Sequence, residues 1–186
     1  MLAAGWFPAA AAQSENQKGE LDPKTTTRVA LASTAGTPGT SVVVPVYFTP
    51  AEGVEVGSLK LDVSFVSVNL KFEKVERGPA AESGNLDLTA QVKSEKNEKG
   101  IESSKLTILT SFPEPPQKGI PTGLLAYLTF RIGGDVKASS ISLTTSAEAK
   151  PIGSDTILKQ LRTFDTKVEI LAPGTLPLTA CFFFSH

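Results

Sequence analysis

Histidine and cysteine are almost missing from this sequence of 186 residues, in which His186 is the only histidine and Cys181 the only cysteine. Nucleophilic triads need a base beside a serine or cysteine, and structural zinc sites draw on several Cys and His ligands. A lone thiol also cannot form an intramolecular disulfide. These absences argue against triad hydrolases and zinc sites, so we expect no metal and no cofactor.

An excess of charge of either sign is missing as well. Lysine and arginine number 18 against 19 aspartates and glutamates, which leaves a net charge of -1. Such a chain has no basic field to attract nucleic acid. No apolar run approaches the ~20 residues that span a bilayer. We therefore expect no nucleic-acid partner and no transmembrane helix of its own.

Calcium, phosphate and dinucleotide loop motifs are absent too. Paired carboxylates could hydrolyse glycosides without histidine, but many acidic residues lie beside lysines, as in residues 93–99. That pattern is typical of a solvated hairpin tip. We expect no enzymatic activity, and a glycosidase is the weakest alternative.

What the chain does contain is an alternation of apolar and polar residues with a period of two, from residue 25 to 171. Hydrophobic residues make up 40% of the sequence, enough to build a core. The predicted strands are residues 29–31, 42–48, 59–65, 70–72, 86–92, 106–112, 124–132, 141–143 and 168–170. Gly, Pro and Asn turn signals separate them. The pattern predicts an all-β antiparallel sandwich of nine strands, with a short helix plausible only at 79–83 or 155–161.

Individual residues refine this prediction. Pro45 inside a strand predicts an edge position or a bulge. Four phenylalanines share the phase of the aliphatic residues and are expected in the core: Phe48, Phe65, Phe112 and Phe130. Tyr47 and Tyr127 have the opposite phase, which leaves them free to be exposed. Two tyrosines make a thin platform for sugars, and ordinary cross-strand packing is the favoured role.

Residues 1–24 are predicted to be an N-terminal extension outside the sandwich. The apolar residues Leu2 to Ala12 end in three alanines before a polar run, which resembles a signal-peptidase site. No positively charged region precedes them. A signal-peptide remnant, with a mature N-terminus near Gln13, and a plain extension both remain open.

Residues 173–186 are predicted to be a hydrophobic C-terminal tail. Pro173 and Pro177 uncouple it from the last strand. Its apolar residues form a patch that a soluble monomer rarely exposes, and we expect them to contact a partner: Leu176, Leu178, Phe182, Phe183 and Phe184. The alternative is that the tail packs on its own sandwich.

The order of strands and turns resembles the cohesin domain. A strand at residues 28–32 leads through Gly-Thr-Pro-Gly to Ser-Val-Val-Val-Pro-Val at 41–46. Residues 123–130, Gly-Leu-Leu-Ala-Tyr-Leu-Thr-Phe, are similar to a strand motif of that family. The resemblance covers residues 28–171. It implies a nine-stranded jelly-roll sandwich, related to some carbohydrate-binding modules, that grips a dockerin partner with one flat sheet face.

The same resemblance implies which residues form the binding face. They are the outward positions of three strands: Ser58, Lys60, Asp62, Ser64, Asp87, Thr89, Gln91, Lys93, Lys105, Thr107 and Ser111. This surface is polar and mixed in charge, and we expect no hydrophobic hot spot on it. An Asn and an Asp that contact dockerin in the family correspond to Ser58 and Lys60. The family's Tyr-Asp-Pro corresponds to Phe-Val-Ser at 65–67, so we expect weak or no binding to ordinary dockerins.

The sequence therefore predicts an exported, non-catalytic protein-binding or structural module, secreted or periplasmic, with its sandwich at residues 25–172. One alternative is an accessory subunit on the outer face of a membrane-associated complex, docked through its apolar tails and thus peripheral to a membrane. A carbohydrate-binding module is the other, with polysaccharide a less favoured partner than protein.

Overall fold

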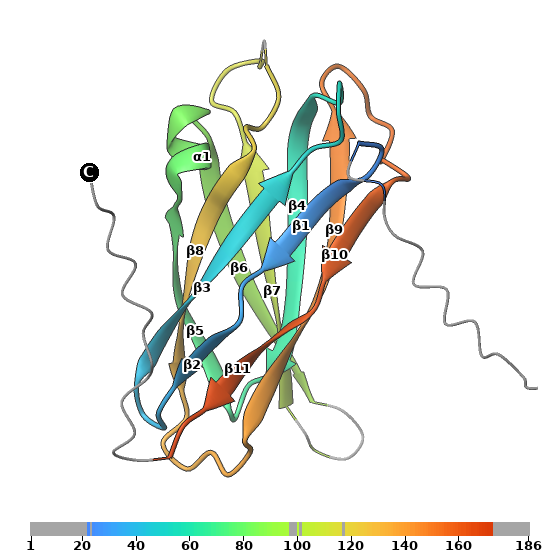
Figure 1. Ribbon diagram of the computed structural model, residues 1–186. Helices are drawn as coiled ribbons and strands as arrows, with labels where there is room; N and C mark the ends of the chain where they lie inside the picture. Colours follow the sequence, from blue (N-terminus) through green and yellow to red (C-terminus); the bar gives the residue numbers. More distant parts are fainter. Residues whose placement is uncertain (1–21, 23, 97–99, 101, 117, 173–186) are drawn as a thin grey trace, which may run out of the picture.

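The computed structural model describes residues 22, 24–96, 100, 102–116 and 118–172, which form two β-sheets packed face to face (Figure 1). The strands are β1 (Thr27–Leu31), β2 (Thr34–Gly36), β3 (Ser41–Thr49), β4 (Val56–Val66), β5 (Leu70–Arg77), β6 (Asp87–Lys96), β7 (Glu102–Ser111), β8 (Gly123–Ile132), β9 (Ser140–Pro151), β10 (Leu161–Phe164) and β11 (Thr166–Ile170). One short helix, α1 (Pro79–Ser83), joins β5 to β6. The predicted all-β sandwich is confirmed.

The two sheets have different sizes. The five-stranded sheet has the order β10-β1-β3-β8-β5, and the six-stranded sheet has the order β2-β11-β9-β4-β7-β6. Most neighbours are antiparallel, but β1 and β10 pair in parallel, as do β2 and β11. The described residues thus hold eleven strands where nine were expected. The two unpredicted strands, β2 and β10, have three and four residues, too few to show a period of two.

The core lies between the sheets and is filled by the inward phase of each strand. In β3, Val42, Val44, Val46 and Phe48 are buried, while Val43 and Tyr47 are exposed. The ring of Phe130 lies at the centre, where Phe65 and Phe72 meet it edge to face at centroid distances of 5.3 and 5.7 Å. Burial is confirmed for Phe48, Phe65 and Phe130. Phe112 is only partly buried.

Two local predictions are now decided. β3 is a central strand, so Pro45 does not lie at an edge. The β3–β8 ladder shifts register between Val46 and Tyr47, but the extra residue is Leu125 on β8 and not on the strand that contains Pro45. The helix expected near Pro79 is present as α1. It follows Gly78, where a Cβ atom would collide with the carbonyl of Leu124. Residues 155–161 form no helix, and Leu161 instead begins β10.

The chain passes from one sheet to the other between the last two strands, β10 and β11. β10 belongs to the five-stranded sheet and β11 to the six-stranded sheet, with Asp165 between them. Its Oδ1 accepts hydrogen bonds from the backbone N–H (2.7 Å) and Oγ1 (3.2 Å) of Thr145 in β9. A side chain thus satisfies a backbone donor where the chain leaves one ladder for the other.

Candidate functional site

The outer face of the six-stranded sheet contains the residues expected to bind a partner, nine of them in its central part. They are Ser58, Lys60, Asp62 and Ser64 on β4, Thr89, Gln91 and Lys93 on β6, and Lys105 and Thr107 on β7. β7 lies between β4 and β6, so Asp62, Thr107 and Gln91 form one row across the sheet. We call this surface the polar face. Asp87 and Ser111 oppose each other near its α1 end.

β9 extends the polar face beyond the predicted residues. Its Thr144, Ser146, Glu148 and Lys150 pair with the four polar-face residues of β4. The sequence prediction had placed only residues 141–143 in this strand, whereas β9 runs from Ser140 to Pro151. The polar residues that alternate with Ile141 and Leu143 were the signal that could have identified it.

Asp62 lies at the centre of the polar face and is the most buried of its charged residues, with 7% of its surface exposed. Its Oδ1 accepts a hydrogen bond of 2.6 Å from the Thr107 hydroxyl. Its Oδ2 lies 2.9 Å from Lys105 Nζ and 3.7 Å from Lys60 Nζ. The carboxylate is therefore fully occupied by its own neighbours, and the lysines are what a partner would meet.

These contacts shift the pKa values of Asp62 and Lys105. Burial alone raises the pKa of Asp62, but the hydrogen bonds from Thr107 and Lys105 and the charges of Lys105 and Lys60 outweigh it and lower the pKa. The same hydrogen bond and charge of Asp62 raise the pKa of Lys105. Lys60 Nζ also lies 3.7 Å from Glu148, so it is held between two carboxylates.

One apolar residue on the polar face was missed. Leu109 on β7 stands between Lys60 of β4 and Thr89 of β6, and 40% of its surface is exposed. The face is therefore not polar throughout, and the expectation that it has no hydrophobic hot spot stays a prediction. The alternation of Leu106, Ile108 and Thr110 as inward residues points Leu109 outward, so the sequence did contain this signal.

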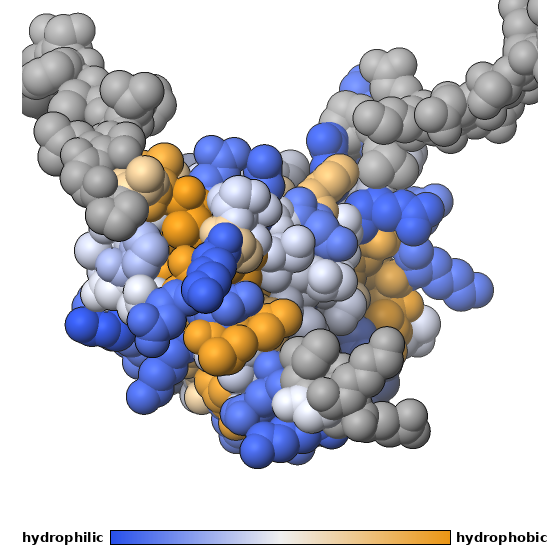
Figure 2. All heavy atoms as spheres, turned by 90° about the horizontal axis from the view of Figure 1, so that it is seen from below, coloured by the Kyte–Doolittle hydropathy of each residue, from blue (hydrophilic) through white to orange (hydrophobic). Residues whose placement is uncertain are grey.

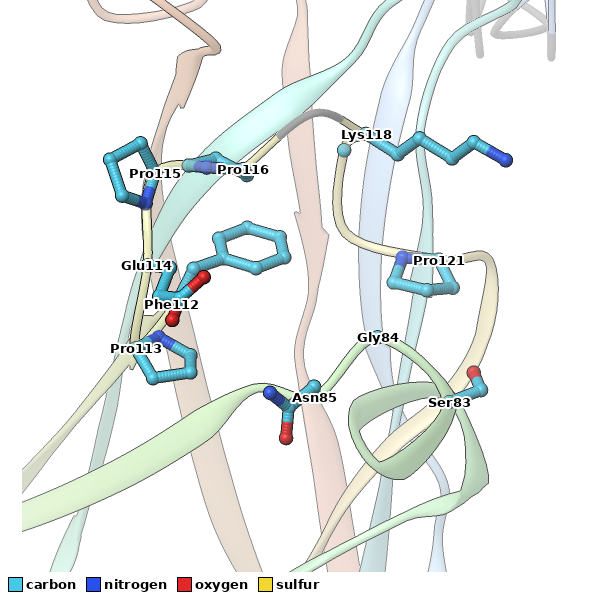
Figure 3. A pocket seen from close by; sticks show the side chains of 11 residues that line it. Ser83, Gly84, Asn85, Phe112, Pro113, Glu114, Pro115, Pro116, Lys118 and Pro121 are labelled. Atoms are coloured by element: carbon cyan, nitrogen blue, oxygen red, sulfur yellow. The ribbon is translucent and has the colours of Figure 1, made fainter.

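A pocket of about 790 Å³ lies beside α1 at the end of the sandwich that is uppermost in Figure 1. Figure 3 shows the ring of Phe112 facing it, with prolines 113, 115, 116 and 121 around it and Glu114 and Lys118 at the rim. Phe112 thus serves the pocket as well as the core. The described residues contain no cluster of three His, Cys, Asp or Glu side chains that could hold a metal ion.

The opposite end of the sandwich shows apolar patches among charged residues (Figure 2). Val68, in the turn between β4 and β5, is 74% exposed. The five tail residues expected to bind a partner, and the possible cleavage site near Gln13, lie outside the described residues. No helix within the described ranges is long and apolar enough to cross a membrane.

No family model matches the sequence, and no curated protein does. Solved structures do. The seventh ScaB type I cohesin from Pseudobacteroides cellulosolvens has a TM-score of 0.60 at 16% identity, covering 82% of this chain and 96% of the cohesin. The third cohesin ScaC from Acetivibrio cellulolyticus, in complex with the ScaB dockerin, has a TM-score of 0.58 at 19% identity, with coverages of 78% and 99%.

A non-cellulosomal cohesin from the hyperthermophilic archaeon Archaeoglobus fulgidus is also similar, with a TM-score of 0.52 at 20% identity and coverages of 79% and 92%. The similarity therefore extends over nearly the whole of each cohesin and includes both sheets. At sequence identities this low, structural similarity establishes the fold but does not identify the residues that bind a partner. The chain therefore has a β-sandwich fold like that of the cohesin domains.

Proposed function

We propose that this protein is a non-catalytic protein–protein interaction module that binds its partner through the polar face. The module is the sandwich of residues 25–172, and it works outside the cytoplasm, secreted or periplasmic. The signal-peptidase-like alanines before Gln13 support export. The scarcity of histidine and cysteine supports a role without catalysis.

The observation that carries the proposal is the setting of Leu109. An exposed leucine within a flat surface of serine, threonine, lysine and carboxylate side chains has the anatomy of a small interface: an apolar centre within a polar rim. The fold likeness adds support, because several similar cohesins were solved in complex with dockerins.

The partner differs in charge pattern from an ordinary dockerin. Lys60 stands where the resemblance implies an acidic contact, and Asp62 and Glu148 hold its ammonium in place. A dockerin group chosen to meet a carboxylate would meet this ammonium instead. In a titration with a type I dockerin we expect weak or no binding. Tight binding that Lys60→Glu abolishes would refute this.

Photo-cross-linking tests the proposal directly. Benzoylphenylalanine is placed at position 109 and, as a control on the end of the sandwich, at position 68. Each protein is then irradiated in the membrane fraction and in the extracellular fraction of the cells that produce it. The partner captured from position 109 is identified by mass spectrometry, purified and titrated. Leu109→Asp should weaken its affinity at least tenfold, since it places a charge in the apolar centre.

Val68→Asp is the matched control, because it adds the same charge to an exposed apolar residue away from the polar face, and it should leave the affinity unchanged. Equal losses from both variants, or cross-linking from position 68 alone, would contradict the assignment of the face.

Two other functions follow from the sequence. An accessory subunit of a membrane-associated complex would dock through the tails, and binding would then need residues 173–186 and not Leu109. A carbohydrate-binding module would need exposed aromatic rings, which lie on the other sheet.

A further inference from the structure

The outer face of the five-stranded sheet carries a row of aromatic residues beside a row of arginines. Tyr47 on β3 and Phe164 on β10 are 44% and 42% exposed, and both pair with Ala30 of β1 between them. Two strand spacings separate the rings by about 10 Å. Because Ala30 is small, nothing taller stands between them. We call this surface the aromatic face.

A cationic row runs beside the aromatic one, two residues away along the strands. Arg28 of β1 pairs directly with Arg162 of β10, and Thr49 follows on β3. Neither arginine forms an ion pair with any described residue. Arg28 Nε is shielded from solvent without a hydrogen-bond partner. Like charges opposite each other destabilise a sheet, so the fold itself gains nothing from this pair.

The aromatic face carries a net positive charge. Its outward residues include five cations and two carboxylates: Arg28, Lys71, Lys74, Arg131, Arg162, Glu73 and Glu76. Glu73 is paired with Arg131 at 3.8 Å and Glu76 with Lys74 at 2.9 Å. The remaining cations, Arg28, Arg162 and Lys71, have no carboxylate partner among the described residues and favour an anionic ligand. A second copy docked through the same face would bring like charges together.

We propose that the aromatic face binds an acidic polysaccharide. Its pyranose rings stack on Phe164 and Tyr47, whose separation suits alternate rings of an extended chain, and its carboxylates contact the guanidinium groups of Arg28 and Arg162. Planar guanidinium forks match carboxylates in geometry, and aromatic rings offer flat apolar surfaces to sugars. This activity goes beyond the proposed function and uses the opposite sheet.

An acidic peptide fits the same surface less well. Side chains on one face of an extended peptide repeat every two residues, or about 6.8 Å, which is shorter than the separation of the two rings. An anionic membrane would be attracted by the same cations, but the face offers it little apolar surface to insert, only the two rings and Val43. Both alternatives are outcomes of the test.

The test is affinity electrophoresis of the full chain in native gels containing polygalacturonate, followed by calorimetry with hexagalacturonate in 150 mM salt. The wild-type protein should be retarded by polygalacturonate and not bind neutral cellohexaose. Arg28→Ala, Arg162→Ala and Tyr47→Ala should each weaken binding about tenfold, the loss of one charge-assisted hydrogen bond or one stacking contact. Arg162→Lys, which keeps the charge, should weaken it less.

Stability separates a binding role from a structural one. Arg162→Ala removes like-charge repulsion, so its melting temperature should equal or exceed that of the wild type while its binding falls. Lys60→Ala and Leu109→Ala on the polar face should bind hexagalacturonate normally. A failure here leaves the cross-linking from position 109 unaffected, so the two proposals fail separately.

Four results would overturn the inference. They are no retardation at any polygalacturonate concentration, binding that Tyr47→Ala does not change, equal affinity for polyglutamate, and sedimentation with phosphatidylglycerol vesicles in place of sugar binding.

Discussion

Asp62 is a charged residue that is nearly buried at the centre of the polar face. Its carboxylate is almost enclosed, yet it stays ionised because a hydroxyl and two ammonium groups surround it. Such a centre fixes the positions of Lys60 and Lys105 before any partner arrives. Ordered side chains lose less entropy on binding, which favours affinity.

Asp62→Asn should lower the free energy of unfolding by about 1 kcal/mol near neutral pH, since the ion pairs are lost and the Thr107 hydrogen bond is kept. The pKa of Asp62 is lowered from 3.8, so its stabilisation is present above that pH and is lost as the pH falls through the lowered value. Denaturant melts across pH 7 to 2 should show the two proteins converging in acid. A gap that persists at the lowest pH would contradict this role.

Alternation along β4, β6 and β7 was enough to predict which side chains share the polar face, because the direction of a side chain in a strand is a local property. It could not predict that Asp62 is buried. Its enclosure depends on Thr107 and Lys105, which lie more than forty positions away in the sequence and join it only through strand pairing. Leu109 was predictable and was overlooked.

At the scale of elements, long strands with a clear period were predicted well, and short ones were not. β10 has only four residues and ends at Phe164, just before the chain changes sheets at Asp165, so it is too short for a period of two to mark it. Its two outward residues, Arg162 and Phe164, are two of the four residues that we propose contact the polysaccharide. That surface was therefore beyond sequence reasoning, which had recognised only the outward phase of Tyr47 and Tyr127.

Asp165→Ala should destabilise the protein by about 1–2 kcal/mol, because Thr145 loses the acceptor of both its backbone N–H and its hydroxyl at a position that is 7% exposed. Asp165→Asn is the matched control, since it keeps an acceptor oxygen, and it should melt close to the wild type. Urea denaturation of the three proteins measures the difference. Equal losses from both substitutions would show that charge, and not the hydrogen bonds, matters here.

At the scale of the whole molecule, the two outer surfaces differ in character. The polar face has its charges paired locally, around Asp62 and Lys60. The aromatic face leaves Arg28 and Arg162 without ion-pair partners among the described residues. A single sandwich with two such surfaces could hold a protein on one side and a polymer on the other.

Truncation after Ala172 tests whether the C-terminal tail belongs to the fold. The ladder of β11 with β2 reaches Ile170, and Leu171 N–H donates to Gly36, so the sandwich is closed before residue 173. The melting temperature should therefore not change, and a loss of co-fractionation with native membranes would support the accessory-subunit alternative. A fall of several degrees, the size that about 1 kcal/mol or more produces, would place the tail in the core instead.

The parallel pairing of the first and last strands has a mechanical consequence. β1 and β2 run alongside β10 and β11 in the same direction, through two ladders that reach from Thr27 to Gly36. A force that pulls residue 24 away from residue 172 acts along these strands, at opposite ends of the sandwich (Figure 1). The ladders are then sheared, and their hydrogen bonds must break together and not one at a time. Tension between two anchoring points would meet its greatest resistance here.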